Sequence, residues 1–424
     1  MVWTLLRGDV RDKLAELPEK SVQCVVTSPP YWGLRSYLPD GYEDKKVELG
    51  LEKTPEEYVQ NMVEVFRGVW RVLRDDGVVW LNLGDSYAGS NQGVGTKTLT
   101  AKQASNRGTV ALTQAKKSVL ASVEGLKPKD LVGIPWRVAF ALQADGWYLR
   151  SAMPWLKGSA MPESVTDRPT SAVEYFFLLT KSERYFYDIE ATRMKGSIPA
   201  GTRAAKGSGE RKSQAGVNAR PPEYKEYSGT RNRRNSDWFM DSIRDILEGK
   251  SGTLLHDENN IPTAIFCNPQ PYKEAHFATF SPRLITPMIL AGTSPRACEI
   301  CGAPWERVVE RQAGVSKECP KTQAAHEARG GTGKPVGTVG KSGSGRIDGY
   351  SITLGWRPTC TCKNEGTGRC IVLDPFVGSG TTLWVAERFG RDSIGIELSP
   401  EYCELINKRM SNRQMTLFER GADL

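Results

Sequence analysis

One short segment carries side chains suited to chemistry on a planar amine. Thr27-Ser28-Pro29-Pro30-Tyr31-Trp32 follows the apolar run 22–26, which is typical of a short buried strand. Prolines fix φ and lack N–H donors, so they leave carbonyl acceptors beside the flat faces of Tyr31 and Trp32. Acceptors beside a stacking surface suit a ring that carries an amino group, such as a nucleobase. A proline-rich turn with two core aromatic residues is the alternative, and the segment alone does not decide between them.

A second segment, a glycine-rich turn near the end of the sequence, predicts a nucleoside site. Asp374-Pro375-Phe376-Val377-Gly378-Ser379-Gly380-Thr381-Thr382 lies between a predicted strand at 370–373 and a predicted helix at 381–389. The next predicted strand ends in Glu397, 23 residues after Asp374. A carboxylate about 20 residues beyond such a turn is placed to accept hydrogen bonds from ribose hydroxyls. Because there is neither a Gly-x-Gly-x-x-Gly motif nor a Walker lysine, pyrophosphate is not the expected ligand.

The elements around the first segment predict a parallel α/β sheet. Thr54-Pro55-Glu56-Glu57 forms a capping box, and apolar residues then recur at helical spacing as far as Leu73. This helix is expected to end at Asp76-Gly77, before a strand at 78–85. A strand, a helix and a strand in this order form a βαβ unit, which implies parallel pairing. Further helices are predicted at 131–144 and 281–291, and further strands at 147–150 and 172–180.

The composition is that of an ordinary globular protein of two or three domains. The chain has 424 residues, of which 39% are hydrophobic and 25% are charged. Nine cysteines without a secretory leader predict a reducing compartment. No apolar run approaches the roughly 20 residues that cross a bilayer. We therefore expect a cytoplasmic protein that has no membrane partner.

The net charge of +8 is unevenly placed and points to a polyanion. Residues 191–236 contain 11 Lys and Arg against 3 Asp and Glu, an excess that equals that of the whole chain. The region 190–262 is either a disordered linker or an insertion that contacts DNA through Arg231, Arg233 and Arg234. Residues 90–129 form a second basic stretch of low apolar content, and we expect a mobile loop there.

Four cysteines in two close pairs are candidate metal ligands. Cys298 and Cys301 are followed, after a long glycine-rich tract, by Cys360 and Cys362. Short turns can direct two thiolates each at one ion, which suits a tetrahedral structural Zn²⁺. The second pair has a Cys-x-Cys spacing, which departs from the usual Cys-x-x-Cys. We favour zinc over free thiols, and a disulfide is not expected in a reducing compartment.

Taken together, the two motifs resemble those of the amino-group DNA methyltransferases that use S-adenosylmethionine. The motif Ser28-Pro29-Pro30-Tyr31 precedes the motif 374–382, which is the order of the permuted class called β. This resemblance implies an α/β fold, a Rossmann-like methyltransferase sheet with permuted motif order. An inserted target recognition region and a small zinc-ribbon-like insertion would interrupt it. The similarity covers Gly8-Asp9, the first strand and the ranges 51–85, 130–188 and 268–410.

The resemblance also implies a division of the chain into five parts. These are a catalytic half at 1–189 with the mobile basic loop 90–129, a target recognition region at 190–262, a cofactor-flanking segment at 263–297, a zinc-binding insertion at 298–365 and a cofactor-binding half at 366–424.

By position, the resemblance assigns a role to each motif residue. Phe376, Gly378 and Gly380 would hold the methionine part of the cofactor, within a turn that includes Asp374 and Thr381. Further cofactor contacts would come from Glu397 to the ribose, Asp9 to the adenine and Phe277 on the opposite side. The catalytic residues would be Ser28, Pro29, Pro30 and Tyr31.

The chemistry of an exocyclic amine gives these four residues their expected roles. Its lone pair is delocalised into the ring, so acceptors for its hydrogens, Ser28 Oγ and the Pro29 carbonyl, would favour a pyramidal nitrogen. That nitrogen would attack the sulfonium methyl group in line. The target base must leave the duplex, with Tyr31 stacking on it.

The choice of base and two rival functions stay open at this point. In the family, the Ser-Pro-Pro-Tyr form is mostly associated with cytosine N4, so we favour that target and keep adenine N6 as the alternative. Carbon-5 methylation would need a cysteine after a proline, and no Pro-Cys dipeptide occurs. A non-catalytic zinc-ribbon DNA-binding protein and an enzyme acting on RNA or a protein amide are the rivals. The expected partner is double-stranded DNA, and a cognate restriction endonuclease would be compatible with it.

Overall fold

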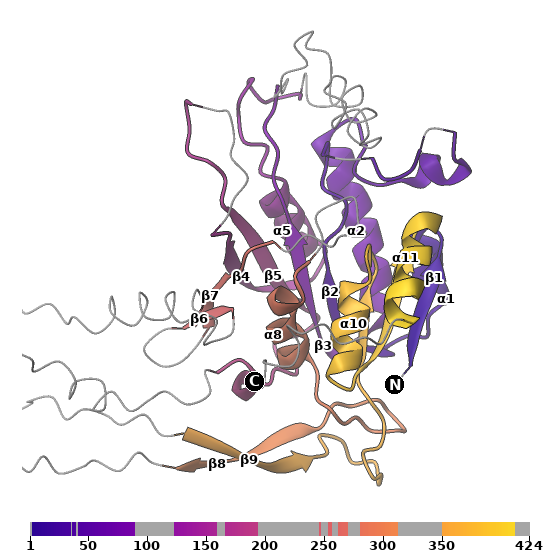
Figure 1. The fold of residues 1–424 in the computed structure, drawn as a ribbon, viewed down its shortest axis with the longest axis vertical. Helices are drawn as coiled ribbons and strands as arrows, with labels where there is room; N and C mark the ends of the chain where they lie inside the picture. Colours follow the sequence, from indigo (N-terminus) through magenta and orange to yellow (C-terminus); the bar gives the residue numbers. More distant parts are fainter. Residues whose placement is uncertain are drawn as a thin grey trace, which may run out of the picture. The chain divides into compact units, whose positions relative to one another are not determined.

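Nine strands of the computed structural model form one sheet in the order β1-β11-β10-β2-β3-β5-β4-β7-β6 (Figure 1). The structure describes residues 2–34, 36–39, 41–89, 123–158, 166–193, 246, 253–256, 262–269, 280–312 and 350–411. The strands of this sheet are β1 (Trp3–Arg7), β2 (Val22–Thr27), β3 (Leu73–Leu83), β4 (Tyr148–Leu156), β5 (Val173–Thr180), β6 (Leu254–His256), β7 (Pro262–Phe266), β10 (Ile371–Asp374) and β11 (Asp392–Glu397). The helices are α1 (Val10–Glu16), α2 (Pro55–Val72), α5 (Ile134–Ala144), α8 (Pro282–Gly292), α10 (Thr381–Arg388) and α11 (Pro400–Ser411), with short 3-10 helices at Glu43–Val47 and Ile189–Ala191.

Two further strands, β8 (Glu306–Gln312) and β9 (Tyr350–Arg357), pair with each other in a separate two-stranded sheet. The chain forms two compact units, and the first contains the nine-stranded sheet. The second comprises 194–233 and 307–355, of which 307–312 and 350–355 are described.

The order of the strands confirms the predicted permuted α/β sheet. β1, β11, β10, β2 and β3 are parallel neighbours, so the last two strands in the sequence lie between the first two. From β10 the chain passes through α10 to β11 on one side, and from β2 through α2 to β3 on the other. The carboxyl ends of β10 and β2 therefore form a topological switch point, the place where open α/β sheets bind ligands. Both motifs of the sequence analysis begin there.

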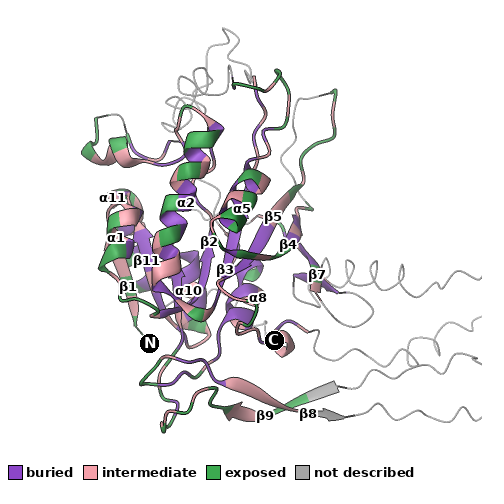
Figure 2. Cartoon of the chain, turned by 180° about the vertical axis from the view of Figure 1, so that it is seen from behind, coloured by how far each residue is buried: buried purple, intermediate pink, exposed green. Residues whose placement is uncertain are grey.

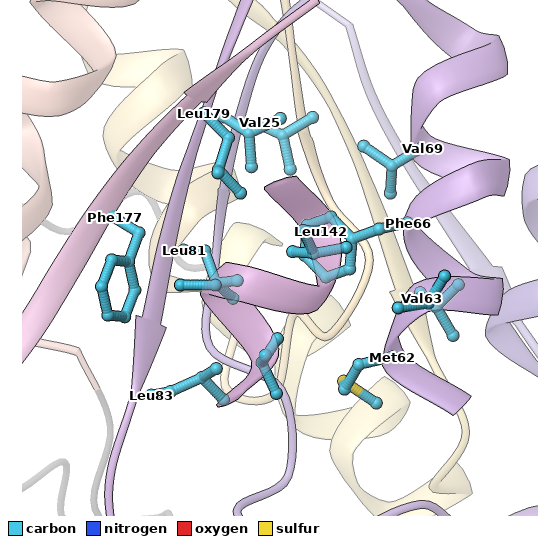
Figure 3. Close-up of a cluster of buried hydrophobic side chains, with 14 of the residues drawn as sticks. Val25, Met62, Val63, Phe66, Val69, Leu81, Leu83, Leu142, Phe177 and Leu179 are labelled. Atoms are coloured by element: carbon cyan, nitrogen blue, oxygen red, sulfur yellow. The ribbon is translucent and has the colours of Figure 1, made fainter. Parts of the chain in front are cut away.

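The central strands are buried on both faces, which gives a three-layered arrangement (Figure 2). Val25 of β2 and Leu81 of β3 pack with Phe66 of α2 in one cluster, to which α1 and α5 also contribute (Figure 3). Val26 and Trp80, the alternate residues, belong to a second cluster with α8 and α10. Alternate residues of a strand point to opposite faces, so the continuous apolar runs reflect helices on both sides of the sheet.

Helix α2 begins as predicted and ends four residues early. The Thr54 side chain accepts a hydrogen bond from the Glu57 N–H at 3.1 Å, as the capping box requires. The helix ends at Val72, because Leu73 is fully buried in an extended conformation and pairs with Val22 of β2. The prediction that the helix continues to Asp76-Gly77 is therefore wrong, and burial of Leu73 in the sheet outweighs the local turn signal.

The other predicted elements are present with shifted ends. Helix α5 begins at Ile134 rather than at 131, because Asp85 Oδ1 accepts hydrogen bonds from the N–H groups of Gly133 (2.9 Å) and Ile134 (3.1 Å). Strand β4 extends to Leu156, beyond the predicted end at Arg150, through antiparallel pairing with β5. Among the helices that the structure describes, none has the length and apolar content to span a bilayer.

Candidate active site

The two predicted motifs are joined by a buried hydrogen bond. Thr27, the last residue of β2, donates from Oγ1 to Asp374 Oδ1 at 2.7 Å, and Thr382 of α10 donates to Asp374 Oδ2 at 2.6 Å. The Phe376 N–H also donates to Asp374 Oδ1, at 3.1 Å. Burial, against these hydrogen bonds, raises the pKa of Asp374 to about 6. Asp374 thus links the turn after β10 to the residue directly before Ser28.

Trp32 and the Pro30 carbonyl belong to the packing around the first motif. The Trp32 ring is fully buried and donates from Nε1 to the Glu52 carbonyl at 2.9 Å. The Tyr58 hydroxyl donates to the Pro30 carbonyl at 2.8 Å. Trp32 therefore has the core role that was its alternative interpretation. In the part of the chain that the structure describes, no donor contacts the Pro29 carbonyl.

The side chains of Ser28, Tyr31, Asn82 and Glu174 form a polar cluster at the switch point. The cluster contains more close oxygen–oxygen contacts than hydroxyl hydrogens that could bridge them. Ser28 Oγ lies 3.3 Å from both Tyr31 Oη and Asn82 Oδ1. Tyr31 Oη lies 2.8 Å from Asn82 Oδ1 and 3.0 Å from Glu174 Oε2. These four oxygen–oxygen contacts share only the two hydroxyl hydrogens of Ser28 and Tyr31. The cluster therefore has a surplus of acceptors, which suits a ligand that brings N–H donors.

The cluster is held by strands β3 and β5. Asn82 Nδ2 donates to Glu174 Oε2 at 3.2 Å and to the Tyr175 carbonyl at 3.1 Å. Glu174 Oε1 forms an ion pair with Lys157, whose Nζ also lies 4.5 Å from the centre of the Trp155 ring. Burial first, and then the negative charge of Glu174, hold the pKa of Tyr31 well above its usual value, so this phenol stays protonated.

Close packing sets the position of the Tyr31 ring. A Cβ added to Gly84 would lie 2.3 Å from Tyr31 Cε2, so only glycine allows this approach at the end of β3.

Glu397 occupies the end of β11 and is held by backbone donors. Its Oε2 accepts from the Gly378 N–H at 3.0 Å and its Oε1 from the Ser399 N–H at 2.8 Å. Burial raises the pKa of Glu397 to about 7 despite these bonds. Each carboxylate oxygen can accept a further hydrogen bond.

The glycine-rich turn has the conformation that its glycines permit. Gly380 has φ 78°, and a Cβ there would lie 3.2 Å from Ile406 of α11. A Cβ on Gly378 would meet no atom closer than the Phe376 carbonyl at 4.0 Å, so the turn leaves room there for a close approach. Arg409 of α11 donates to the Ser379 carbonyl at 2.8 Å and to Thr381 Oγ1 at 2.9 Å, which fixes the turn from outside.

Asp9 lies beside Glu397, because β1 pairs with β11 and the Gly8 N–H donates to the Glu397 carbonyl at 3.0 Å. The Asp9 carboxylate caps α1 and accepts from the Arg11 side chain at 3.0 and 2.6 Å. Burial alone would raise the pKa of Asp9, but the Arg11 hydrogen bonds and charge outweigh it and the pKa is lowered. Asp9 is therefore ionised, and it is already paired.

The four predicted metal ligands converge. The sulfur atoms of Cys298, Cys301, Cys360 and Cys362 all lie within 4.8 Å of one another, a geometry that can hold a metal ion. The Cys301 and Ile300 N–H groups donate to the Cys298 sulfur at 3.4 Å each. These bonds, the one from Cys301 first, lower the pKa of Cys298 to about 7.

Side chains of the large sheet hold the Cys298–Cys301 turn. Gln23 Nε2 donates to the Gly302 carbonyl at 2.8 Å, and its Oε1 accepts from the Ile371 N–H at 2.5 Å. Arg74 donates to the Cys301 carbonyl. One glutamine thus joins the cysteine turn to both β2 and β10.

Several predicted residues lie outside the described parts of the chain. These are Phe277, Arg231, Arg233, Arg234 and residues 90–122 of the predicted basic loop. Conversely, the sequence analysis missed Asn82, Glu174, Lys157 and Arg409. An asparagine within the otherwise apolar strand 78–83 is a signal that could have identified Asn82. Glu174 and Lys157 carry no such local signal, since Glu174 reaches Tyr31 only through the pairing of β5 with β3, and Lys157 reaches Glu174 only through the pairing of β4 with β5.

Comparison with known proteins places the chain in a family. The model of a family described as DNA methylase matches residues 22–298 and 362–408. The type II methyltransferase M.Cfr9I of Citrobacter freundii is 33% identical over 419 residues, which cover 99% of this chain and 91% of that protein. The type II methyltransferase M.SmaI of Serratia marcescens is 30% identical and covers 97% of this chain and 91% of that protein.

Among solved structures, the PvuII DNA methyltransferase (cytosine-N4-specific) aligns with 98% of this chain and 89% of its own, at 15% identity and a TM-score of 0.48. The matches of the family model and of the curated relatives show the family of this chain. By these findings, the chain belongs to the N6/N4 DNA methylase family, the S-adenosylmethionine-dependent methyltransferases of amino groups in DNA.

Proposed function

We propose that this protein methylates the exocyclic N4 of cytosine in a flipped-out base of double-stranded DNA at a specific sequence. The observation that carries the proposal is the surplus of acceptors around Ser28 and Tyr31, where four close oxygen contacts share two hydrogens. A primary amine brings two N–H donors and so supplies the hydrogens that these acceptors lack. The Ser-Pro-Pro-Tyr form, which in the family is mostly associated with cytosine N4, favours that target over adenine N6, whereas the neutral hydroxyl of Ser28 is compatible with either amine.

In this proposal the first motif prepares the amine. Ser28 Oγ and the Pro29 carbonyl accept the two amine hydrogens and thereby favour a nitrogen with an available lone pair. The half-buried Tyr31 ring, fixed against Gly84, stacks on the base. The reaction then depends on placing the nitrogen in line with the methyl group more than on acid or base strength.

The residues at the other side of the switch point fit S-adenosylmethionine, which supplies the methyl group as a sulfonium when bound. Glu397 has free lone pairs for the ribose hydroxyls, and its position is fixed by two N–H donors. Gly378 leaves room for a close approach, and Phe376, Gly380 and Thr381 complete the turn. Asp374 holds this turn to Thr27, so we assign it to positioning the turn. We further propose, as the resemblance implies, that Asp9 contacts the adenine of the cofactor and that Phe277 lines the opposite side of the cofactor.

Binding of S-adenosylmethionine is expected to weaken as the pH falls below 7. The ribose hydroxyls need an ionised Glu397 as acceptor, whereas the free protein holds the pKa of Glu397 at about 7. Bound cofactor therefore favours loss of the proton, and affinity should fall about tenfold for each pH unit below 7. Calorimetric titration from pH 5.5 to 8.5 measures this dependence.

The matched variant is Glu397→Gln, which keeps the size of the side chain and removes its titration. It should bind more weakly at pH 8 and show little change between pH 6 and 8. An equally strong pH dependence in Glu397→Gln would contradict the assignment of Glu397 to the ribose.

DNA contacts are assigned to the region 190–262, the proposed target recognition region. Arg231, Arg233 and Arg234 would contact phosphates and guanines there, and the basic loop 90–129 would add phosphate contacts. The remaining divisions, 1–189, 263–297, 298–365 and 366–424, keep their proposed roles. Since the similar proteins of Citrobacter freundii and Serratia marcescens are type II methyltransferases, we also propose a cognate restriction endonuclease as a partner.

Zinc is the metal that we propose for the four cysteines. Four thiolates within one small radius suit Zn²⁺, which favours tetrahedral sulfur coordination. With all four positions filled by protein, such a site is structural, and it would tie the 298–302 turn to the Cys360-Thr361-Cys362 turn.

The product of the reaction tests the proposed function. Unmethylated DNA is incubated with the protein and S-adenosylmethionine, digested to nucleosides and analysed by chromatography with mass detection. The expected product is N4-methylcytosine, which must be separated from 5-methylcytosine by retention time because the two have the same mass. Detection of N6-methyladenine would show that the target is adenine N6, the alternative, and not cytosine N4. Unmodified nucleosides alone would contradict the proposed methyltransferase function.

A further inference from the structure

Glu174 is the described carboxylate that lies closest to the proposed catalytic residues without a role in the proposed function. It belongs to β5, and its side chain is 16% exposed. Its Oε2 contacts Tyr31 Oη at 3.0 Å and Asn82 Nδ2 at 3.2 Å, while its Oε1 is paired with Lys157. Each of these three groups can donate a hydrogen bond, so the carboxylate is held in orientation with one oxygen directed at the Tyr31 hydroxyl.

The reaction leaves a proton that the residues nearest the amine cannot keep. When the amine nitrogen forms its bond to the methyl carbon, the carbon–sulfur bond breaks and sulfur takes the electron pair. The positive charge of the sulfonium passes to nitrogen, which must then lose one hydrogen as a proton. Ser28 and Tyr31 are neutral hydroxyls, and the amide oxygen of Asn82 is not basic. A proton acceptor is needed beyond them.

Other carboxylates near the switch point already accept hydrogen bonds that serve the fold. Both oxygens of Asp374 accept buried hydrogen bonds from Thr27 and Thr382. Asp85 caps α5 through the Gly133 and Ile134 N–H groups. In the described residues, no carboxylate other than Glu174 contacts the Ser28 and Tyr31 hydroxyls.

We propose that Glu174 is the terminal acceptor of the proton that the methylated amine releases, reached through Ser28 and Tyr31. The amine N–H passes its proton to Ser28 Oγ, the Ser28 hydroxyl hydrogen passes to Tyr31 Oη over 3.3 Å, and the Tyr31 hydrogen passes to Glu174 Oε2 over 3.0 Å. One N–H bond breaks, one O–H bond forms on Glu174, and both hydroxyls are restored. Lys157 holds the carboxylate in place, and partial exposure lets Glu174 return the proton to water.

The inference rests on the proposed amine methylation, and single-turnover transfer of a tritiated methyl group to unmethylated plasmid DNA tests both. Glutamine at 174 can still accept the Tyr31 hydrogen bond through its carbonyl oxygen but cannot take up the proton at neutral pH. Glu174→Gln should therefore slow methyl transfer by about 100-fold and change S-adenosylmethionine binding by less than twofold. Tyr31→Phe interrupts the same path, so the double variant should be no slower than the slower single variant.

A rescue experiment separates proton transfer from support of the fold. Glu174→Ala opens space for a small acid, and formate should restore part of the rate, while chloride at equal ionic strength should not. Formate should not restore Tyr31→Phe, in which the path is broken upstream. Because Glu174→Gln leaves the Lys157 charge without its partner, the same rates are measured in the Lys157→Met background. Glu183→Gln, which removes an exposed carboxylate just beyond β5, is the matched control and should leave the rate unchanged.

The two levels of the proposal fail in different ways. No methyl transfer by the unchanged protein would overturn the proposed function and the proton path with it. An active protein whose Glu174→Gln variant keeps its rate, or whose double variant multiplies the two single losses, would overturn the proton path alone.

Discussion

Ser28→Ala is expected to lower the rate of methyl transfer by about 100- to 1000-fold and to leave S-adenosylmethionine binding largely intact. Ser28 Oγ is the proposed acceptor for one amine hydrogen, and it lies at the carboxyl end of β2 beside the Tyr31–Asn82 contact. Alanine removes this acceptor without disturbing the buried bond between Thr27 and Asp374 that joins the motif to the cofactor turn. The change should therefore act on the chemical step rather than on the cofactor.

Tyr31→Ala should lose at least as much activity, because it removes the stacking ring as well as the hydroxyl. Single-turnover rates with tritiated cofactor measure both losses, and calorimetry measures cofactor affinity. Ser21→Ala, which changes a half-buried serine just before the other end of β2, is the control and should retain full activity. Unchanged rates in Ser28→Ala and Tyr31→Ala would mean that the catalytic site lies elsewhere.

Removal of the proposed zinc ion from the four-cysteine site is expected to lower the stability of the protein more than any other change proposed for it. The 298–302 turn is anchored to β2 and β10 through Gln23 and to the α2–β3 junction through Arg74. Loss of a structural zinc would free this turn and the Cys360–Cys362 turn together. A cost of a few kcal/mol corresponds to a fall of about 3 to 5 °C in the melting temperature for a chain of 424 residues.

Purified protein should contain one zinc ion per chain, measured by atomic emission. The double variant Cys301→Ser/Cys362→Ser should contain none and should melt at the temperature of chelator-treated protein. Cys403→Ala, which changes a buried cysteine of α11 outside the cluster, should keep the metal. Metal-free protein that melts at the same temperature with and without chelator would contradict a structural zinc site.

Local signals account for the elements that the sequence predicted well. The capping box at Thr54 depends on residues only a few positions apart. The same is true of the succession of strand, glycine-rich turn and helix around Gly380. Where an end was wrong, a distant contact was the cause. Leu73 leaves α2 early because it pairs with Val22, about 50 residues away, which no pattern within the helix records.

The motifs were recognisable because their chemistry is continuous in the sequence. Ser28 to Tyr31 are one continuous segment and Asp374 to Thr382 are another, and it was the presence of both motifs in this order that indicated an amine site together with a nucleoside site. The adjacency of the two turns was implied by the family resemblance. Its physical basis is the pairing of β10 with β2 and the bond from Thr27 to Asp374, 347 positions apart.

The sequence by itself thus determined the class of chemistry, the α/β fold with permuted motifs and the set of four cysteines. Only the tertiary structure decided which side chains surround the Ser28 and Tyr31 hydroxyls. Asn82 of β3 and Glu174 of β5 contact Tyr31, and Lys157, which directly follows β4, pairs with Glu174. These contacts exist only once β3, β5 and β4 are paired. A hydrogen-bond network of this kind depends on distances between distant residues, which composition and local periodicity do not encode.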